Sequence, residues 1–231
     1  MIYMLISACF FSLMAFFLKL LYLNSYIGTY EVTYWQSMFM MCLNFGLFKV
    51  YAKDHLTVPV NMRTTLVWRA ITGFLGMTGY YLALEYTDLS KATTLYWTNP
   101  VFTAVIAYFW IDESLNFVDW LAIFTSFGGI LVIQNPYQLW QSAHQLSISD
   151  YLGSSAAIGG ALFFSVSQMQ TRKLGKKVHF LIPPLYQSLF SAFIAPLIMF
   201  IMLRYRQSLT TSYNWYETWM LALISLCFFL G

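Results

Sequence analysis

The sequence is poor in charge. Asp, Glu, Lys and Arg make up 9% of its 231 residues, against about 25% in an ordinary soluble domain. Hydrophobic residues make up 59%, which leaves too little polar surface to coat a water-soluble globule. A soluble enzyme and a disordered chain are therefore excluded. The formal net charge of +3 is too weak to favour a nucleic-acid partner.

Residues that carry covalent or metal chemistry are also scarce. The three cysteines lie in separate apolar runs, at Cys9, Cys42 and Cys227. They form neither a CxxC pair nor a disulfide framework. The three histidines are far apart, and no Ser/His/Asp arrangement or phosphate-binding glycine loop is present. The sequence predicts no catalytic residue, no metal site and no cofactor, and hence no enzyme.

Long apolar stretches dominate the chain instead. A membrane helix needs roughly 20 mostly apolar residues to cross about 30 Å of hydrocarbon. Eight stretches are candidates: 3–23, 31–51, 66–86, 92–111, 117–134, 152–171, 181–203 and 217–231. The first lacks a basic start and a cleavage site, so we expect a retained anchor rather than a signal peptide. The fold class predicted is an all-α, multi-pass integral membrane protein.

The basic residues predict the orientation, because cytoplasmic loops of membrane proteins are enriched in Lys and Arg. Eight of the twelve flank the loops after the second and sixth stretches: Lys49, Lys53, Arg63, Arg69, Arg172, Lys173, Lys176 and Lys177. We therefore expect a cytoplasmic N-terminus, with residues 52–65 and 172–180 also cytoplasmic. The pair Arg204 and Arg206 counts against this orientation. The sequence leaves open whether the protein lies in the plasma membrane or an endomembrane.

The chain repeats itself at an offset of about 152 residues. The matched segments are Phe10–Ser12 with Phe163–Ser165, Gln36–Phe39 with Gln187–Phe190, and Trp68 with Trp219. We expect a first copy at 1–136, an inter-repeat loop at 137–150 and a second copy at 151–231. A five-span unit forces its second copy to insert upside down, which gives inverted repeats. The second copy is expected to lack the equivalents of the fourth and fifth spans.

A recognisable pattern lies between residues 80 and 136. Its parts are the run Tyr80–Ala92 (YYLALEYTDLSKA), the run Thr98–Thr103 (TNPVFT), the acidic Asp112–Leu115 (DESL) and Gly128–Ile133 (GGILVI). This pattern resembles the EamA branch of the drug/metabolite transporter superfamily. The resemblance implies ten helices in two inverted five-helix repeats, with a cavity between them. It also implies transport of a small organic solute, without indicating which one.

Three residues of the fourth stretch are candidates for binding the solute. Pro100 lies mid-stretch, where it removes a backbone hydrogen bond and predicts a kink. The freed carbonyl near Tyr96 must then be satisfied by a neighbour or by cavity water. Asn99 and Trp97 lie beside it and could hydrogen-bond and stack on a solute. Each has an alternative role in helix packing.

Gln36 and Gln187 occupy matching places in the two copies and are the other candidates. Ser12 and Ser165 match in the same way. Such pairs line a cavity or bond one helix to another, and interhelical bonding is the more common role. Glu85 is the nearest candidate for a buried carboxylate, but it lies at the end of a stretch, where a solvated position is favoured.

Small residues recur along two stretches, at Gly73, Gly76 and Gly79 and at Gly153, Ala157 and Ala161. Such spacing lets helix backbones approach closely, so we interpret it as structural.

The function predicted is transport of a small organic solute or metabolite by alternating access. The alternatives are a multi-helix membrane receptor, a membrane-embedded transferase, or a non-transporting fragment of a transporter. The inverted repeat argues against a receptor, and the missing polar catalytic cluster argues against a transferase. The partners expected are the lipid bilayer and the solute, with a homodimer left open and no nucleic acid.

Overall fold

The computed structural model describes residues 2–51, 58–111, 116–134, 148–175, 178–203 and 213–230. Every regular element in these ranges is helical. The helices are α1 (Ile2–Asn24), α2 (Thr29–Tyr51), α3 (Val60–Tyr86), α4 (Leu89–Tyr96), α5 (Asn99–Ile111), α6 (Phe117–Gln134), α8 (Ile148–Leu174), α9 (Ile182–Leu203) and α10 (Trp215–Leu230). The eight predicted stretches therefore coincide with helices, except that the fourth, 92–111, is divided between α4 and α5. The acidic pair at 112–113 and most of the expected inter-repeat loop lie outside the described residues.

The chain divides into two compact units, each described by itself. One unit is Met1–Phe74 with Lys176–Gly231, and the other is Leu75–Gly175. Helix α3 contributes its first part to the former and its last part to the latter.

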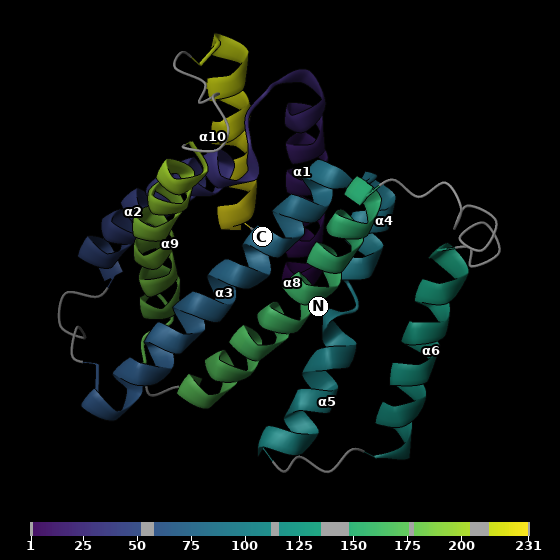
Figure 1. Ribbon diagram of the computed structural model, residues 1–231. Helices are drawn as coiled ribbons and strands as arrows, with labels where there is room; N and C mark the ends of the chain where they lie inside the picture. Colours follow the sequence, from purple (N-terminus) through teal and green to yellow (C-terminus); the bar gives the residue numbers. More distant parts are fainter. Residues whose placement is uncertain are drawn as a thin grey trace. The chain divides into compact units, whose positions relative to one another are not determined.

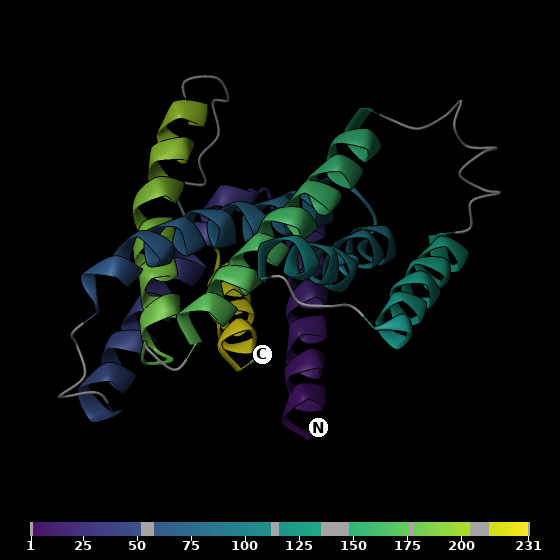
Figure 2. The ribbon, with the colours of Figure 1, turned by 90° about the horizontal axis from the view of Figure 1, so that it is seen from below.

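In the first unit, α2 packs against α9, and α10 packs against both α1 and α2 (Figures 1 and 2). Large apolar side chains of α1, among them Met14, Leu18 and Leu21, are completely buried. Rings join the helices as well. The Phe74 and Phe190 centroids are 5.8 Å apart in an edge-on contact between α3 and α9. The core of this unit is thus shared by helices from both ends of the chain.

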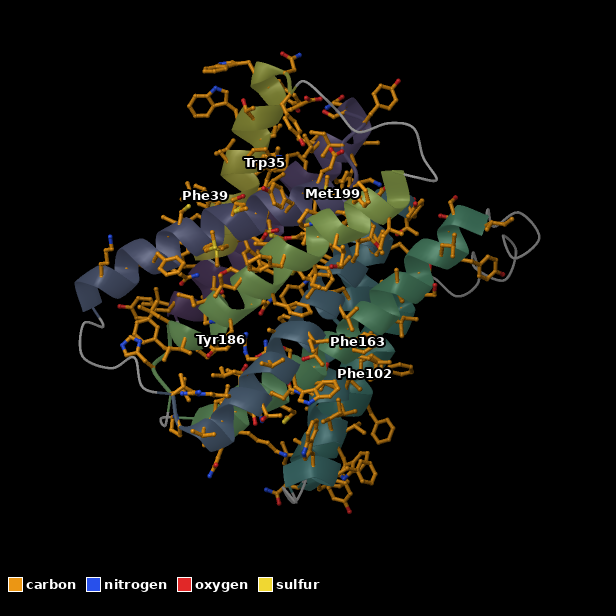
Figure 3. All side chains as sticks on the ribbon, turned by 60° about the vertical axis from the view of Figure 1, so that its left-hand side comes forward. Trp35, Phe39, Phe102, Phe163, Tyr186 and Met199 are labelled. Atoms are coloured by element: carbon orange, nitrogen blue, oxygen red, sulfur yellow. The ribbon has the colours of Figure 1, made fainter. Side chains whose placement is uncertain are left out.

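In the second unit, α8 packs along α4 and α5, and α6 contacts α4 and α5 (Figure 1). Phe102 on α5 and Phe163 on α8 mark these two packed helices in Figure 3. Much of α6 stays exposed, including Phe124 and Leu121. Helix α8 is therefore the element against which the fourth predicted stretch is placed.

Within the second unit, helices α3 and α8 approach closely and run antiparallel. A Cβ added at Gly79 would lie 2.8 Å from the Ala156 carbonyl oxygen, and one at Gly160 would lie 2.9 Å from the Gly76 carbonyl oxygen. Backbone atoms at such distances leave no room for a side chain. The small-residue pattern therefore has the structural role expected: Gly76 and Gly79 face α8, and Gly73 faces Gln187 of α9.

Two helical segments among the described residues are long and apolar enough to cross a membrane on their own, Leu5–Asn24 and Ile182–Ile201. Trp215–Leu230 is apolar but shorter. The remaining long helices contain more polar and small residues, as in α8, where Ser165, Ser167 and Gln170 are buried. A polar helix reaches lipid depth only when its polar groups face other helices or water.

Candidate functional site

The fourth predicted stretch is interrupted at Trp97 and Thr98, where α4 ends and α5 begins. Pro100 explains the interruption, because proline has no N–H and its ring clashes with the carbonyl four residues earlier. Proline is well tolerated in the first turn of a helix, and Pro100 is the second residue of α5. The sequence predicted a kink within one helix, whereas the structure has two helices joined by a turn.

Local hydrogen bonds complete this break. The Trp97 N–H donates to the Thr93 carbonyl at 2.9 Å, and the Val101 N–H donates to the Thr98 carbonyl at 3.0 Å. The Thr98 hydroxyl donates to the Leu95 carbonyl at 2.7 Å. These side-chain and backbone hydrogen bonds thus replace part of the regular helical hydrogen-bonding pattern between α4 and α5.

Ser165 attaches the break to α8. Its buried hydroxyl lies 2.8 Å from the carbonyl oxygen of Asn99 and 2.7 Å from that of Ala161. Ser12, the serine that the sequence comparison pairs with Ser165, is exposed and donates to the Ala8 carbonyl of its own helix. The two serines therefore make different contacts, and of the two only Ser165 joins two helices.

An aromatic cluster lies directly before the break. Tyr96 stacks on Tyr80, with ring centroids 4.2 Å apart and planes 26° from parallel. Phe164 of α8 lies 5.6 Å from the Tyr96 ring. Tyr96 is 1% exposed, and none of the described residues hydrogen-bonds its hydroxyl. The sequence indicated the backbone carbonyl near Tyr96 but predicted no role for the tyrosine ring.

The three predicted residues of the break differ in exposure. Trp97 is 45% exposed and Pro100 is exposed, whereas Asn99 is buried. The backbone carbonyl of Asn99 accepts hydrogen bonds from the hydroxyls of Ser165 and Thr103. An exposed indole can stack on a flat solute, and an amide can both donate and accept. Contact of these residues with a solute stays a prediction.

The two predicted glutamines belong to the other unit. Gln36 is buried in α2, and Gln187 is half-buried in α9. Arg69 on α3 donates from Nη1 to Gln187 Oε1 and to the Pro183 carbonyl, each at 3.0 Å. In the sequence, Arg69 is one of the basic residues flanking the loop after the second stretch, whereas in the structure it hydrogen-bonds to α9. A cavity shared by these glutamines and the α4–α5 break stays a prediction.

Among the carboxylates that the structure describes, Glu31 is buried and Glu85 is not. Glu31 lies in the first turn of α2 and is 5% exposed, while Glu85 is half-buried and Asp88 is exposed. Negative charge is favoured at a helix N-terminus. Sequence reasoning overlooked Glu31, although an acidic residue at the start of an apolar stretch is a signal for such a position.

Comparison with known proteins decides the family. The model of the EamA-like transporter family matches residues 1–134, more than half of the chain. The chain belongs to the EamA-like transporter family. The resemblance seen in the sequence is thereby confirmed, and the family is one of membrane transporters rather than enzymes.

Curated relatives of this EamA-like chain carry transporter names. Human "Solute carrier family 35 member G1" is 30% identical over 184 residues, covering 77% of this chain and 49% of the relative. "Probable transporter vicT" of Bipolaris victoriae is 27% identical, covering 52% and 37%. The "S-adenosylmethionine uptake transporter" of Rickettsia bellii is 22% identical, covering 50% and 39%. The chain spans half or less of the length of these relatives.

Proposed function

We propose that the full-length protein moves a small organic solute across a membrane by alternating access between two inverted repeats, 1–136 and 151–231, joined by the loop 137–150. In this scheme α1, α2 and α3 of the first copy correspond to α8, α9 and α10 of the second. The family match over residues 1–134 supports the extent of the first copy.

The helix pairings are the observation that carries this proposal. Inverted repeats are related by a two-fold axis in the membrane plane, so every contact should have a counterpart when the copies are exchanged. The contact of α1 with α10 has its counterpart in that of α8 with α3. The contact of α2 with α10 has its counterpart in that of α9 with α3, and α2 with α9 is its own counterpart. The pairings therefore support equivalent roles for the two copies.

The α4–α5 break is the proposed place of solute contact in the first copy. Trp97 supplies an exposed ring, and Asn99 supplies an amide. Pro100 keeps α4 and α5 from joining into one continuous helix at this point. Gln36 and Gln187 are the second proposed pair of contacts. A relative named as an S-adenosylmethionine uptake transporter supports a metabolite-sized organic solute.

Uptake into proteoliposomes tests this function. The purified full-length protein is reconstituted and offered labelled solutes of different charge: a dicarboxylate, a phosphate monoester, a neutral sugar and an amine. Uptake of at least one solute above that of protein-free vesicles is expected. Stable, correctly folded protein that moves none of them would contradict transport. The mass of the same preparation in detergent tests the proposed homodimer.

The proposed topology has eight crossings with a cytoplasmic N-terminus, and single cysteines test it. Arg63 and Asp88 are both exposed and lie at opposite ends of α3. Each is replaced by cysteine in a background without the three native cysteines. With an impermeant thiol reagent on intact cells, Asp88→Cys is expected to be labelled, and Arg63→Cys only after permeabilisation. The reverse pattern would invert the assignment.

A further inference from the structure

The hydroxyl of Tyr96 is a buried donor at the end of a helix. Tyr96 is the last residue of α4 and is 1% exposed, and none of the described residues hydrogen-bonds its hydroxyl. Polar groups buried in native proteins nearly always have a hydrogen-bond partner, because leaving one without a partner is costly. This hydroxyl is therefore suited to a partner that comes from outside the described residues.

The backbone carbonyl of Tyr96 is affected by the same break. In a continuous helix the carbonyl of residue 96 accepts the N–H of residue 100, but Pro100 has no N–H. The next residue, Trp97, is 45% exposed. At membrane depth such an interrupted backbone is tolerated only where it is buried in protein or lines a water-filled cavity. A hydroxyl donor, a carbonyl acceptor and an exposed ring thus lie on two successive residues.

The surroundings of the Tyr96 ring restrict the partner to an uncharged group. Tyr80 stacks on the ring, with centroids 4.2 Å apart, and the Phe164 centroid lies 5.6 Å away. The face of an aromatic ring is electrostatically negative, which disfavours an anion. Burying a full charge of either sign among such rings is costly without a charged partner. A neutral oxygen, in a carbonyl or a hydroxyl group, accepts from Tyr96 without that cost.

We propose that the Tyr96 hydroxyl donates a hydrogen bond to a neutral oxygen of the transported solute when the α4–α5 break opens. This assignment rests on the proposed function and names the chemical class of its solute: a ring that stacks on Trp97, carrying an amide or a hydroxyl. The α5 side of the break is held by Ser165, whose hydroxyl lies 2.8 Å from the Asn99 carbonyl oxygen. The α4 side, with Tyr96 and Trp97, is the part that moves.

The sharpest variant is Tyr96→Phe, which removes one oxygen atom and keeps the stacked ring. Because the hydroxyl has no partner among the described residues, its removal should leave the ligand-free unfolding temperature at or above that of wild type. Tyr22→Phe is the matched control. The Tyr22 hydroxyl lies 3.0 Å from the Thr29 hydroxyl, so the same deletion there breaks a hydrogen bond and should lower the unfolding temperature.

The experiment measures the unfolding temperature of the full-length protein in neutral detergent, titrated with benzamide, benzoate or benzylamine at matched ionic strength. These probes share one ring and carry a neutral, an anionic and a cationic group. Benzamide is expected to stabilise wild type and Tyr22→Phe with equal apparent affinity. For Tyr96→Phe this affinity should fall at least fivefold. Benzoate and benzylamine should bind wild type at least tenfold more weakly than benzamide does.

Four results overturn the proposal. They are the lack of a response to benzamide, equal benzamide affinity in wild type and Tyr96→Phe, tighter binding of benzoate or benzylamine, and a loss of ligand-free stability in Tyr96→Phe as large as that in Tyr22→Phe. Each leaves the proposed function standing if proteoliposomes take up any solute of the uptake panel. Benzamide binding that depends on Tyr96, without uptake of any solute, would uphold the role of Tyr96 in binding and reject transport.

Discussion

Replacing Gly160 with leucine is expected to remove nearly all folded, monodisperse protein, whereas leucine at the adjacent Gly159 should leave it close to wild type. A Cβ at position 160 would meet backbone atoms of α3, 2.9 Å from the Gly76 oxygen and 3.0 Å from the Tyr80 nitrogen. Nothing lies within 4 Å of a Cβ at position 159. Overpacking typically costs about 1–3 kcal/mol, and a contact with backbone belongs at or above the upper end.

The measurement is fluorescence-detected size-exclusion chromatography of the two variants, tagged and extracted in the same detergent. At least a tenfold smaller monodisperse peak is expected for Gly160→Leu. Because the two positions are neighbours on one helix, insertion and helix propensity are matched between them. Equal peaks would show that the close approach of α3 and α8 does not hold the second unit together.

Replacing Trp97 or Asn99 with alanine is expected to weaken solute uptake roughly five- to hundredfold without loss of protein. Stacking on an aromatic side chain is worth about 1–3 kcal/mol per ring where it has been measured on nucleobases. A net hydrogen bond is worth about 1 kcal/mol, and 1.4 kcal/mol is a factor of ten. Trp97 is 45% exposed, so removing its ring leaves little void in the core.

The control is Trp120→Ala, because Trp120 belongs to the same unit and is 42% exposed. Uptake is compared per mole of reconstituted protein, and the unfolding temperature is measured in parallel. Uptake that falls only in proportion to the amount of folded protein would make Trp97 and Asn99 packing residues. The matched Gln36 and Gln187 would then be the next candidates.

The position of the helix break could be predicted from the sequence, but its form could not. Pro100 indicated where the ladder of hydrogen bonds must fail, since the effect of proline is local. Whether the helix bends or ends depends on other partners, and Ser165, which holds the Asn99 carbonyl, lies 66 residues further along the chain. No periodicity in the fourth stretch contains that information.

The helices were predictable because apolar length is a property of one segment at a time, and the predicted stretches coincide with helices in the structure, the fourth with both α4 and α5. The hydrogen bonds of Arg69 were not predictable, because its acceptors lie 114 and 118 residues further along the chain. The glycine pattern was predictable in one respect and unpredictable in another. Its spacing indicated close helix packing, yet only the structure shows that Gly76 and Gly79 face α8 while Gly73 faces α9.

Counterflow tests the central claim, carriage by alternating access, most directly. Proteoliposomes containing the full-length protein are loaded with a high concentration of an unlabelled solute that the uptake panel has identified. They are then diluted into a trace of the same solute carrying a label. A carrier that exposes one site alternately to each side is predicted to accumulate the label transiently above its outside concentration. A channel or a receptor gives no such overshoot. Equilibration without an overshoot would contradict alternating access by this member of the EamA-like family.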